Sequence, residues 1–189
     1  MRVFSEQLAE QLKAGLRACY LIFGDEPLQK MEALQQIRHT ARAQGFTDVW
    51  RFSAIEEPLP WDDIHACSQS LSLFAERQII ELELGEKFPK EWAERISELQ
   101  KQLHPDLLLI ILGPKLNSAQ SKSSWFTSLD KQGIYIPVAL PDARYFPRWM
   151  KLRSQQCGLR IDNDGITFLC HAFEGNLLAA AQELEKLAL

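Results

Sequence analysis

Apolar residues follow two alternating patterns along the first 140 positions. Short unbroken apolar runs are typical of strands buried on both faces, and apolar residues recurring every three or four positions are typical of amphipathic helices. The runs that predict strands cover residues 18–23, 49–52, 78–84, 106–112 and 134–138. The helices expected around them cover residues 5–14, 27–44, 61–69, 91–103 and 118–131. This alternation predicts a three-layer α/β domain with a five-stranded parallel sheet and flanking helices.

Single residues refine these expected elements. Pro27 is expected to begin its helix, and Ser118 to cap the helix that follows it. The run 106–112 is expected to be the central strand. Pro137 cannot donate a backbone hydrogen bond, which predicts that its strand lies at a sheet edge or that the strand ends there. Alternating acids in residues 78–84 predict a strand with one more exposed face.

The strand pattern stops after Leu140. Residues 145–156, 163–173 and 176–189 are expected to form three helices, separated by Gly158 and Gly175. We therefore divide the chain into an α/β domain, residues 1–140, and a small helical domain, residues 141–189. The last helix has an apolar face that nothing after it covers, so we expect a fragment truncated at its C-terminus.

Size and composition exclude several classes of protein. With 189 residues, of which 46% are hydrophobic and 24% charged, the chain can bury a core without a disulfide or metal. The four cysteines and four histidines are scattered and form no CxxC motif, so no metal site is expected. The longest apolar run, residues 107–112, is too short to cross a membrane, and no signal peptide is recognised. We expect a cytoplasmic protein in a reducing compartment.

The formal net charge of −4 is unevenly distributed. Residues 54–94 contain ten acids and three bases, a balance that should repel nucleic acid. Residues 141–160 reverse it, with Asp142 as the one acid against Arg144, Arg148, Lys151, Arg153 and Arg160. A solvated helix face explains this stretch more simply, and contact with phosphates is the alternative, so direct binding to DNA stays open.

The first strand-to-helix loop is where a parallel α/β domain would bind a nucleotide. Residues 23–30 read FGDEPLQK, with one glycine, two acids and no hydroxyl group. A phosphate-binding loop needs several glycines, a lysine and a Ser or Thr for magnesium. Asp25 and Glu26 would repel phosphate, and Pro27 removes an N–H donor. We expect a degenerate nucleotide site, no cofactor, and a purely structural turn at Gly24.

No other group of side chains predicts catalysis. Residues 113–117, after the fourth strand, contain no acidic pair for a metal; Lys115 and Asn117 there could bind an anion but are more simply turn residues. A G-x-S-x-G turn for a serine nucleophile is not present. Cys19 falls within a buried strand, where a thiol is inert. We expect no catalytic residue and no enzymatic mechanism.

An apolar pair stands in the connection between residues 61–69 and 78–84, where polar residues would be usual. Leu71 can still face the core as the last helical residue. Leu73 and Phe74 are adjacent, so in any regular continuation they point to different sides and at least one is exposed. Either the connection folds back so that both cover the sheet, or the pair is an anchor for a pocket on a partner.

Several segments of the chain together resemble one known family. They are EQL and GLRACYL (residues 6–8 and 15–21), AQGF (43–46), SLSLFA (70–75), DLLLI (106–110), WFT (125–127), PRW (147–149) and EGNLLA (174–179). In this order and spacing they resemble the δ subunit of the bacterial DNA polymerase III clamp loader, of the γ-proteobacterial type. The resemblance covers essentially the whole chain.

The resemblance implies an AAA+-like fold that has lost its nucleotide site, in a non-catalytic subunit of the DNA polymerase III holoenzyme. It implies binding to the sliding clamp, the β subunit, and opening of that ring for loading onto DNA in replication. By position, the clamp-binding residues are Leu73 and Phe74, with Gln69, Leu71 and Ser72 in the same element. It also implies contact with other loader subunits through a C-terminal domain missing here. The alternative is a nucleotide- or nucleic-acid-binding α/β protein.

Overall fold

A computed structural model of the chain describes residues 1–55, 57–69 and 77–189. Its sheet is parallel, with the strand order β2-β3-β4-β1-β5. The strands are β1 (Cys19–Gly24), β2 (Phe46–Ser53), β3 (Arg77–Glu83), β4 (Leu107–Gly113) and β5 (Ile134–Val138). Strand β4 is central, and β5, which contains Pro137, is an edge strand. Both expectations are confirmed.

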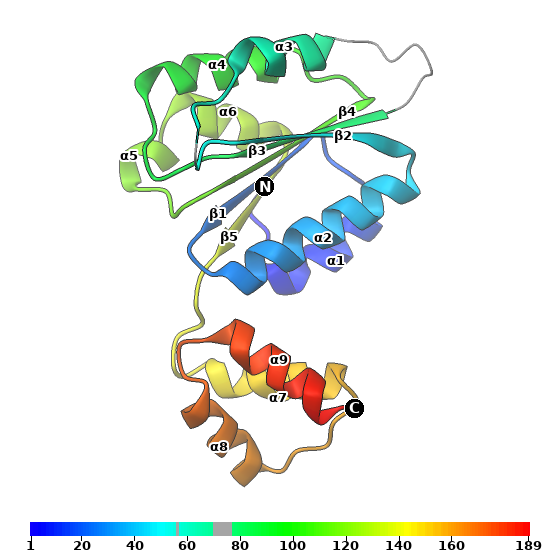
Figure 1. Cartoon of the computed structure of the whole chain (residues 1–189), viewed down its shortest axis with the longest axis vertical. Coiled ribbons are helices and arrows are strands. Elements are labelled where there is room, and N and C mark those ends of the chain that lie inside the picture. The colour runs from blue at the N-terminus through cyan, green and yellow to red at the C-terminus, as the bar shows by residue number, and fades with distance from the viewer. Residues whose placement is uncertain (56, 70–76) are drawn as a thin grey trace. The chain divides into compact units, whose positions relative to one another are not determined.

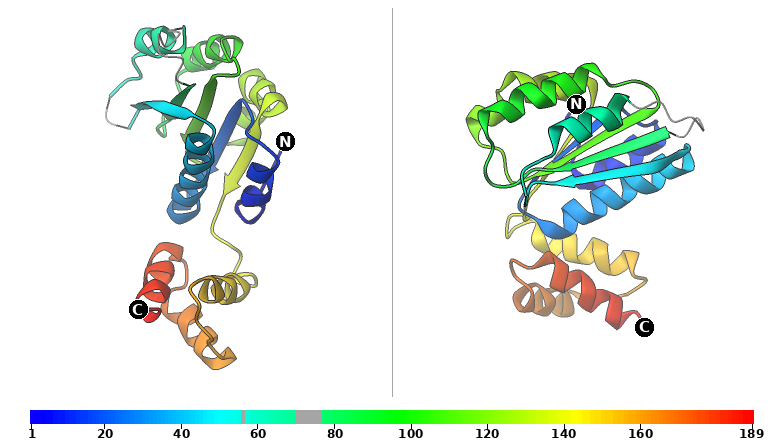
Figure 2. Two further views of the ribbon diagram at one scale, coloured as in Figure 1. Left: turned by 90° about the vertical axis from the view of Figure 1, so that its right-hand side faces the viewer. Right: turned by 45° about the horizontal axis from the view of Figure 1, so that its top comes forward.

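Helices cover both faces of the sheet (Figures 1 and 2). One face packs against α1 (Leu8–Lys13) and α2 (Pro27–Ala43). The other packs against α3 (Trp61–Gln69), α4 (Lys90–Lys101) and α6 (Ser124–Gln132). Every residue of β1 and β4 is buried, as their unbroken apolar sequences require between two helical layers. The predicted three-layer α/β fold is confirmed.

Aromatic rings fill much of the layer that α3, α4 and α6 form. The Trp61 and Trp92 ring centroids lie 6.2 Å apart, and Trp92 meets Phe88 edge-on at 5.7 Å. Phe88 also stacks on Trp125 at 5.1 Å. These contacts link α3 to α6 through α4 and the residues just before it. Tilted and stacked ring pairs of this kind are favourable in a protein core.

The acids of β3 do not form an exposed face, so that expectation is wrong. Glu81 is 4% exposed and lies in the middle of the strand. Its carboxylate accepts hydrogen bonds from Arg38 of α2 and from Arg51 of β2, the latter at 3.2 Å. The charge is tolerated in the interior because two guanidinium groups pair with it.

Two expected helices are interrupted. A 3₁₀ turn, Ser5–Gln7, precedes α1 instead of a continuous helix from Ser5. The helix expected over residues 118–131 is divided into α5 (Ser118–Ser121) and α6. Asn117, not Ser118, caps α5, because its side chain accepts a hydrogen bond of 2.8 Å from the Gln120 N–H.

Contacts within the chain define two compact units. The first contains Met1–Asp25 and Gln29–Val138, and the second contains Glu26–Leu28 and Ala139–Leu189. The second unit has its own core, formed by α7 (Phe146–Gln156), α8 (Asn163–Ala172) and α9 (Leu177–Leu187). The three helices expected there are confirmed. No helix in the described part of the chain has the length and apolar character needed to span a membrane.

Candidate functional site

The loop between β1 and α2 is shaped by contacts within the protein. Gly24 has a φ of +145°, and a Cβ there would lie 1.7 Å from the backbone oxygen of Val138 in β5. Only glycine fits such a close approach of two strands. The single glycine of this loop therefore serves the turn, as its sequence suggested.

The acids of this loop stand at the start of α2. The Asp25 carboxylate accepts a hydrogen bond of 3.0 Å from the backbone N–H of Lys115, and Glu26 is 4% exposed. Pro27, the first residue of α2, has no N–H to offer. Two carboxylates thus precede the helix end at which an anion would otherwise be attracted.

The cysteine of β1 is part of the core. Cys19 is fully buried, and its Sγ lies 3.4 Å from the carbonyl oxygen of Leu129. Burial raises the pKa of the Cys19 thiol to about 12, so the reactive thiolate is not formed at neutral pH. The expectation that Cys19 falls within a buried strand is confirmed. Among the described residues, no group of His, Cys, Asp or Glu side chains is placed to hold a metal ion.

The second candidate site is the connection between α3 and β3. Helix α3 has the bounds that its sequence predicts, Trp61–Gln69. Ile64 is buried in the core, whereas Gln69, the last helical residue, is exposed. The other predicted clamp-binding residues, Leu71, Ser72, Leu73 and Phe74, lie outside the described residues. The structure describes the residues on either side of this connection, namely the last turn of α3 and the beginning of β3.

The last turn of α3 is fastened to the end of α4. Ser68 is 2% exposed, and its hydroxyl lies within hydrogen-bonding distance of the His65 carbonyl oxygen (2.8 Å) and of Gln102 Oε1. Gln102 is the C-cap residue of α4, and its Oε1 is also 3.3 Å from His65 Nδ1. One amide oxygen therefore faces two side chains of α3.

The first residue of β3, Arg77, makes three side-chain contacts. Arg77 Nε lies 3.0 Å from Asp106 Oδ1, and Arg77 Nη1 donates a hydrogen bond of 3.1 Å to the Gln44 carbonyl oxygen. The same guanidinium group lies 5.4 Å from the centre of the Phe46 ring. Ser68, just before the connection, and Arg77, directly after it, are thus both held by contacts with other parts of the first unit.

The two candidate sites belong to opposite edges of the sheet. All strands are parallel, and β1 ends where it passes into α2, whereas β3 begins where the connection from α3 ends. The β1–α2 loop is therefore at the carboxyl edge and the beginning of β3 at the amino edge (Figure 1). A partner bound beside Gln69 and Arg77 would approach the sheet from the edge opposite to the usual nucleotide position.

Sequence reasoning did not identify the residues that anchor the connection. Gln102 lies 34 residues after Ser68, and Asp106 lies 29 residues after Arg77. No local pattern relates such distant polar residues, because they meet only once α4 has packed on α3 and β4 has paired with β3. The one local signal in the sequence is the charged pair Glu76 and Arg77, which follows the apolar residues of the connection.

The basic stretch lies in the second unit and is partly neutralised there. Arg144 pairs with Asp142 at 3.4 Å, and Arg153 pairs with Glu185 at 3.6 Å. Within the described chain, Arg148, Lys151 and Arg160 are exposed and form no ion pair. This arrangement is what a solvated helix face would show, and it also leaves three cations accessible to phosphates.

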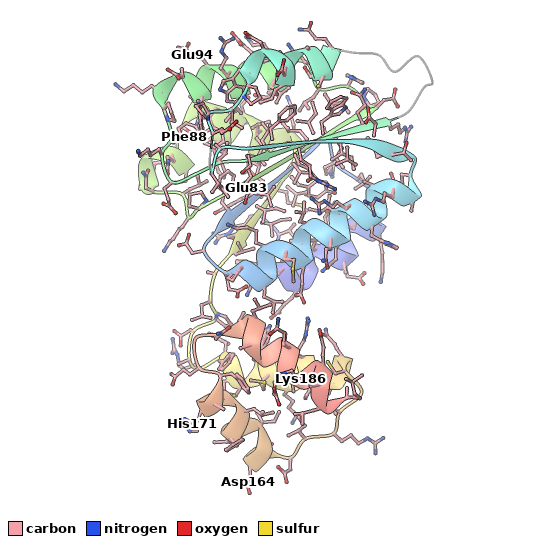
Figure 3. The ribbon with its side chains drawn as sticks, viewed as in Figure 1. Glu83, Phe88, Glu94, Asp164, His171 and Lys186 are labelled. Atoms are coloured by element: carbon pink, nitrogen blue, oxygen red, sulfur yellow. The ribbon has the colours of Figure 1, made fainter. Side chains whose placement is uncertain are left out.

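A pocket of about 350 Å³ lies in the same unit, between the start of α7 and the end of α8. Its lining includes Phe146, Cys170 and His171, the last labelled in Figure 3. Burial raises the pKa of the Cys170 thiol, so this cysteine is not activated as a nucleophile. The predominantly apolar walls suit an apolar group better than a phosphate.

Comparison with known proteins decides the family. The family described as DNA polymerase III, delta subunit, matches residues 20–139, which are most of the first unit and include the α3–β3 connection. The chain belongs to the DNA polymerase III δ subunit family. The δ subunit of Escherichia coli K12 is 41% identical over 190 residues, which cover the whole chain and 55% of that protein. The chain thus spans about half the length of the curated δ subunits it matches.

Solved structures show that the fold is shared with δ subunits and with other replication and recombination proteins. The clamp loader δ protein of Bacillus subtilis superimposes with a TM-score of 0.70 at 18% identity, covering 97% of this chain and 57% of that one. The RuvB Holliday junction branch migration motor of Thermotoga maritima gives 0.56 at 15% identity, with coverages of 97% and 59%. The AAA+-like fold expected from the sequence is confirmed.

Proposed function

We propose that this chain is the clamp-binding part of a clamp-loader δ subunit. It binds the sliding clamp, the β subunit of DNA polymerase III, and opens the ring so that it can be loaded onto DNA during replication. One observation carries the proposal: the match to the δ subunit family over residues 20–139, which contain the apolar connection. The anchored flanks at Ser68 and Arg77 support it, because they suit an element that presents a partner-binding segment.

In this proposal Leu73 and Phe74 are the anchors that fill an apolar pocket on the clamp. Gln69, Leu71 and Ser72 precede them in the same element, and Gln69 is exposed at the end of α3. An aromatic residue beside an aliphatic one is a common centre of binding energy in protein interfaces. The acidic stretch over residues 54–94 argues against nucleic acid as the partner at this edge of the sheet.

The proposal assigns no nucleotide chemistry to the chain. The β1–α2 loop offers one glycine, which the approach of Val138 requires, and two carboxylates at the start of α2. A phosphate brought to this loop would meet negative charge and few N–H donors. Clamp binding is therefore independent of ATP.

Ring opening then comes from binding energy alone. A protein without ATP hydrolysis can shift the clamp toward an open ring only by binding the open form more tightly than the closed form. Leu73 and Phe74 supply the attachment, and the folded first unit behind them supplies the bulk that disfavours the closed ring. A short peptide carrying the pair should bind without opening the ring.

The two compact units correspond, in this proposal, to the α/β clamp-binding domain and a small helical domain. The curated relatives extend well beyond the matched region. We assign contact with the other loader subunits to that further part of the protein. Clamp binding belongs to the chain described here.

The competing function is that of a nucleotide- or nucleic-acid-binding α/β protein. Its support is the group of exposed cations on the second unit, Arg148, Lys151 and Arg160. Fold class does not favour it, because one fold serves many functions. The two functions predict different ligands: the sliding clamp for the first, and a nucleotide or nucleic acid for the second.

The test is equilibrium binding of the purified 189-residue chain to immobilised sliding clamp, with and without Mg-ATP, beside a titration of the chain with single-stranded DNA. We expect saturable clamp binding with equal affinity in both conditions. Release of the clamp from circular DNA should follow when the chain, but not a peptide of residues 69–76, is saturating. Absence of clamp binding, or binding that requires ATP, would overturn the proposal.

A further inference from the structure

A small polar cluster lies between the end of α3 and the end of α4, directly before the connection. It comprises Ser68 and His65 of α3 and Gln102, the C-cap residue of α4. The Ser68 hydroxyl can donate to the His65 carbonyl oxygen at 2.8 Å or to Gln102 Oε1, and the His65 ring reaches the same Oε1 at 3.3 Å. On its other side, His65 Nε2 faces Glu98 Oε2 at 3.6 Å.

The cluster is partly buried, with Ser68 as its most buried member. Ser68 is 2% exposed, and the His65 side chain is 14% exposed. Ile64 is the other buried side chain of α3, and it packs in the core one turn before Ser68. Ser68 is therefore the last buried residue of the helix, and Gln102 is its polar contact to a neighbouring helix.

We propose that Gln102 is a positioning residue for clamp binding: its amide oxygen holds the last turn of α3 through Ser68 and His65, and so sets where the segment after Gln69 leaves the helix. This inference rests on the proposed function of that segment. Without the acceptor, the Ser68 hydroxyl keeps its partner within α3 but loses its partner on α4. The last turn can then fray, and the clamp must select the smaller population in which that turn is ordered.

The structure offers a matched control on the same helix. Gln100 Nε2 donates a hydrogen bond of 2.9 Å to Ser128 Oγ of α6, so Gln100 also links α4 to a serine of a neighbouring helix. Its contact lies on the α6 side and does not touch α3. Substitution of Gln100 should reduce stability without affecting the α3–β3 connection.

The experiment compares Gln102→Met with Gln100→Met in the 189-residue chain. Methionine keeps the length of each side chain and removes its hydrogen-bonding groups. The melting temperature and the equilibrium affinity for the purified sliding clamp are measured for each variant. We expect Gln102→Met to weaken clamp binding about fivefold to tenfold, and Gln100→Met to change it less than about twofold at a similar loss of melting temperature.

Two further variants separate positioning from stability. Gln102→Glu keeps an acceptor oxygen and should restore clamp affinity to within about threefold of the original chain. Ser68→Ala removes the other partner and should weaken binding about as much as Gln102→Met. The double variant should be no worse than Gln102→Met alone, because both substitutions remove the contact between Ser68 and Gln102. If Gln102→Met does not fold, Ser68→Ala and Gln102→Glu still measure the effect.

Equal affinities for the Gln102→Met and Gln100→Met variants would overturn the positioning role while the clamp-binding function stands. Additive losses in the double variant would also overturn it. The function itself is tested in the same series by Leu73→Ala with Phe74→Ala. If the original chain did not bind the clamp, or if that double variant still bound fully, the proposed function and this inference would both fail.

Discussion

The two edges of the sheet differ in what their loops do for the protein. At the carboxyl edge, the β1–α2 loop makes contacts within the chain: Gly24 admits Val138, and Asp25 accepts a hydrogen bond from Lys115. At the amino edge, residues Ser68 and Arg77 anchor a connection that carries an unusual apolar pair. The proposed function assigns partner recognition to the amino edge, whereas the carboxyl edge, where a parallel α/β domain would bind a nucleotide, makes contacts within the chain. Each of the following predictions tests one side of this comparison.

The largest effect is expected at the amino edge, for Leu73→Ala combined with Phe74→Ala. Truncation of two central anchors costs at least about 4 kcal/mol, so clamp affinity should fall about a thousandfold or more. The melting temperature should change little, because an anchor for a partner is exposed in the free protein. Clamp titration and thermal unfolding of the same sample measure both quantities.

The chain offers a matched control for this double variant. Leu152 and Phe168 lie in the second unit and are 42% and 71% exposed. Their replacement by alanine removes the same two side-chain types and should leave clamp affinity unchanged. A fall of several degrees in the melting temperature for the Leu73 and Phe74 variant, but not for this control, would mean that the pair packs on the chain's own core.

The next largest effect is expected at the carboxyl edge, for Gly24→Ala. The new Cβ would clash with the backbone oxygen of Val138, and the positive φ adds strain. The free energy of unfolding should therefore fall by at least about 3 kcal/mol. Gly45→Ala is the control: its φ is +89° and its Cβ would have open space, so strain alone should cost about 1 kcal/mol. Urea unfolding measures both. Similar costs for the two variants would show that the approach of β5 does not constrain the loop.

A moderate effect is expected for Arg77→Met at the amino edge. The variant loses an ion pair, a hydrogen bond and a ring contact that are partly exposed, so stability should fall by about 1 kcal/mol. Clamp affinity should fall several-fold, because the beginning of β3, where the connection ends, is held less firmly. Lys13→Met, which breaks an exposed ion pair with Glu10 in α1, should change neither quantity measurably. Clamp affinity that survives in the Arg77 variant would contradict an anchoring role.

The smallest effect is expected for ATP. A site with micromolar affinity would stabilise the fold by about 2.7 kcal/mol or more once ATP reached a hundred times its dissociation constant. We expect no shift of the melting temperature at millimolar Mg-ATP, because the β1–α2 loop lacks the donors for phosphates. A rise of several degrees would show that the carboxyl edge has kept its original role.

Local patterns were sufficient for most of the fold. Helix α3 and strand β5 have the bounds that their sequences predict, and Gly133 lies directly before β5. The prediction that β3 has an exposed face is wrong. The partner that allows Glu81 to be buried, Arg38, is 43 residues away in the sequence, on α2. Pattern alone treats a charge as exposed unless its partner is close in sequence.

The candidate site likewise has one part that the sequence predicts and one part that it does not. The apolar pair at Leu73 and Phe74 could be found from the sequence because it breaks the usual polarity of a connection. Its anchors could not, since Gln102 and Asp106 are ordinary polar residues until tertiary packing brings them to Ser68 and Arg77. Positioning groups of this kind have no signature in a single sequence.

The aromatic contacts behind α3 provide a spectroscopic reporter. Three of the five tryptophans, Trp61, Trp92 and Trp125, lie in one layer of the first unit, and the Trp61 and Trp92 ring centroids are 6.2 Å apart. Excitation energy passes readily between indoles at such separations, so a change at α3 alters the emission of the group. Trp50 and Trp149 lie outside this layer and can be replaced to remove their background. The proposed attachment of the clamp at the end of α3 should then be observable in real time from the protein's own ultraviolet fluorescence, without a dye.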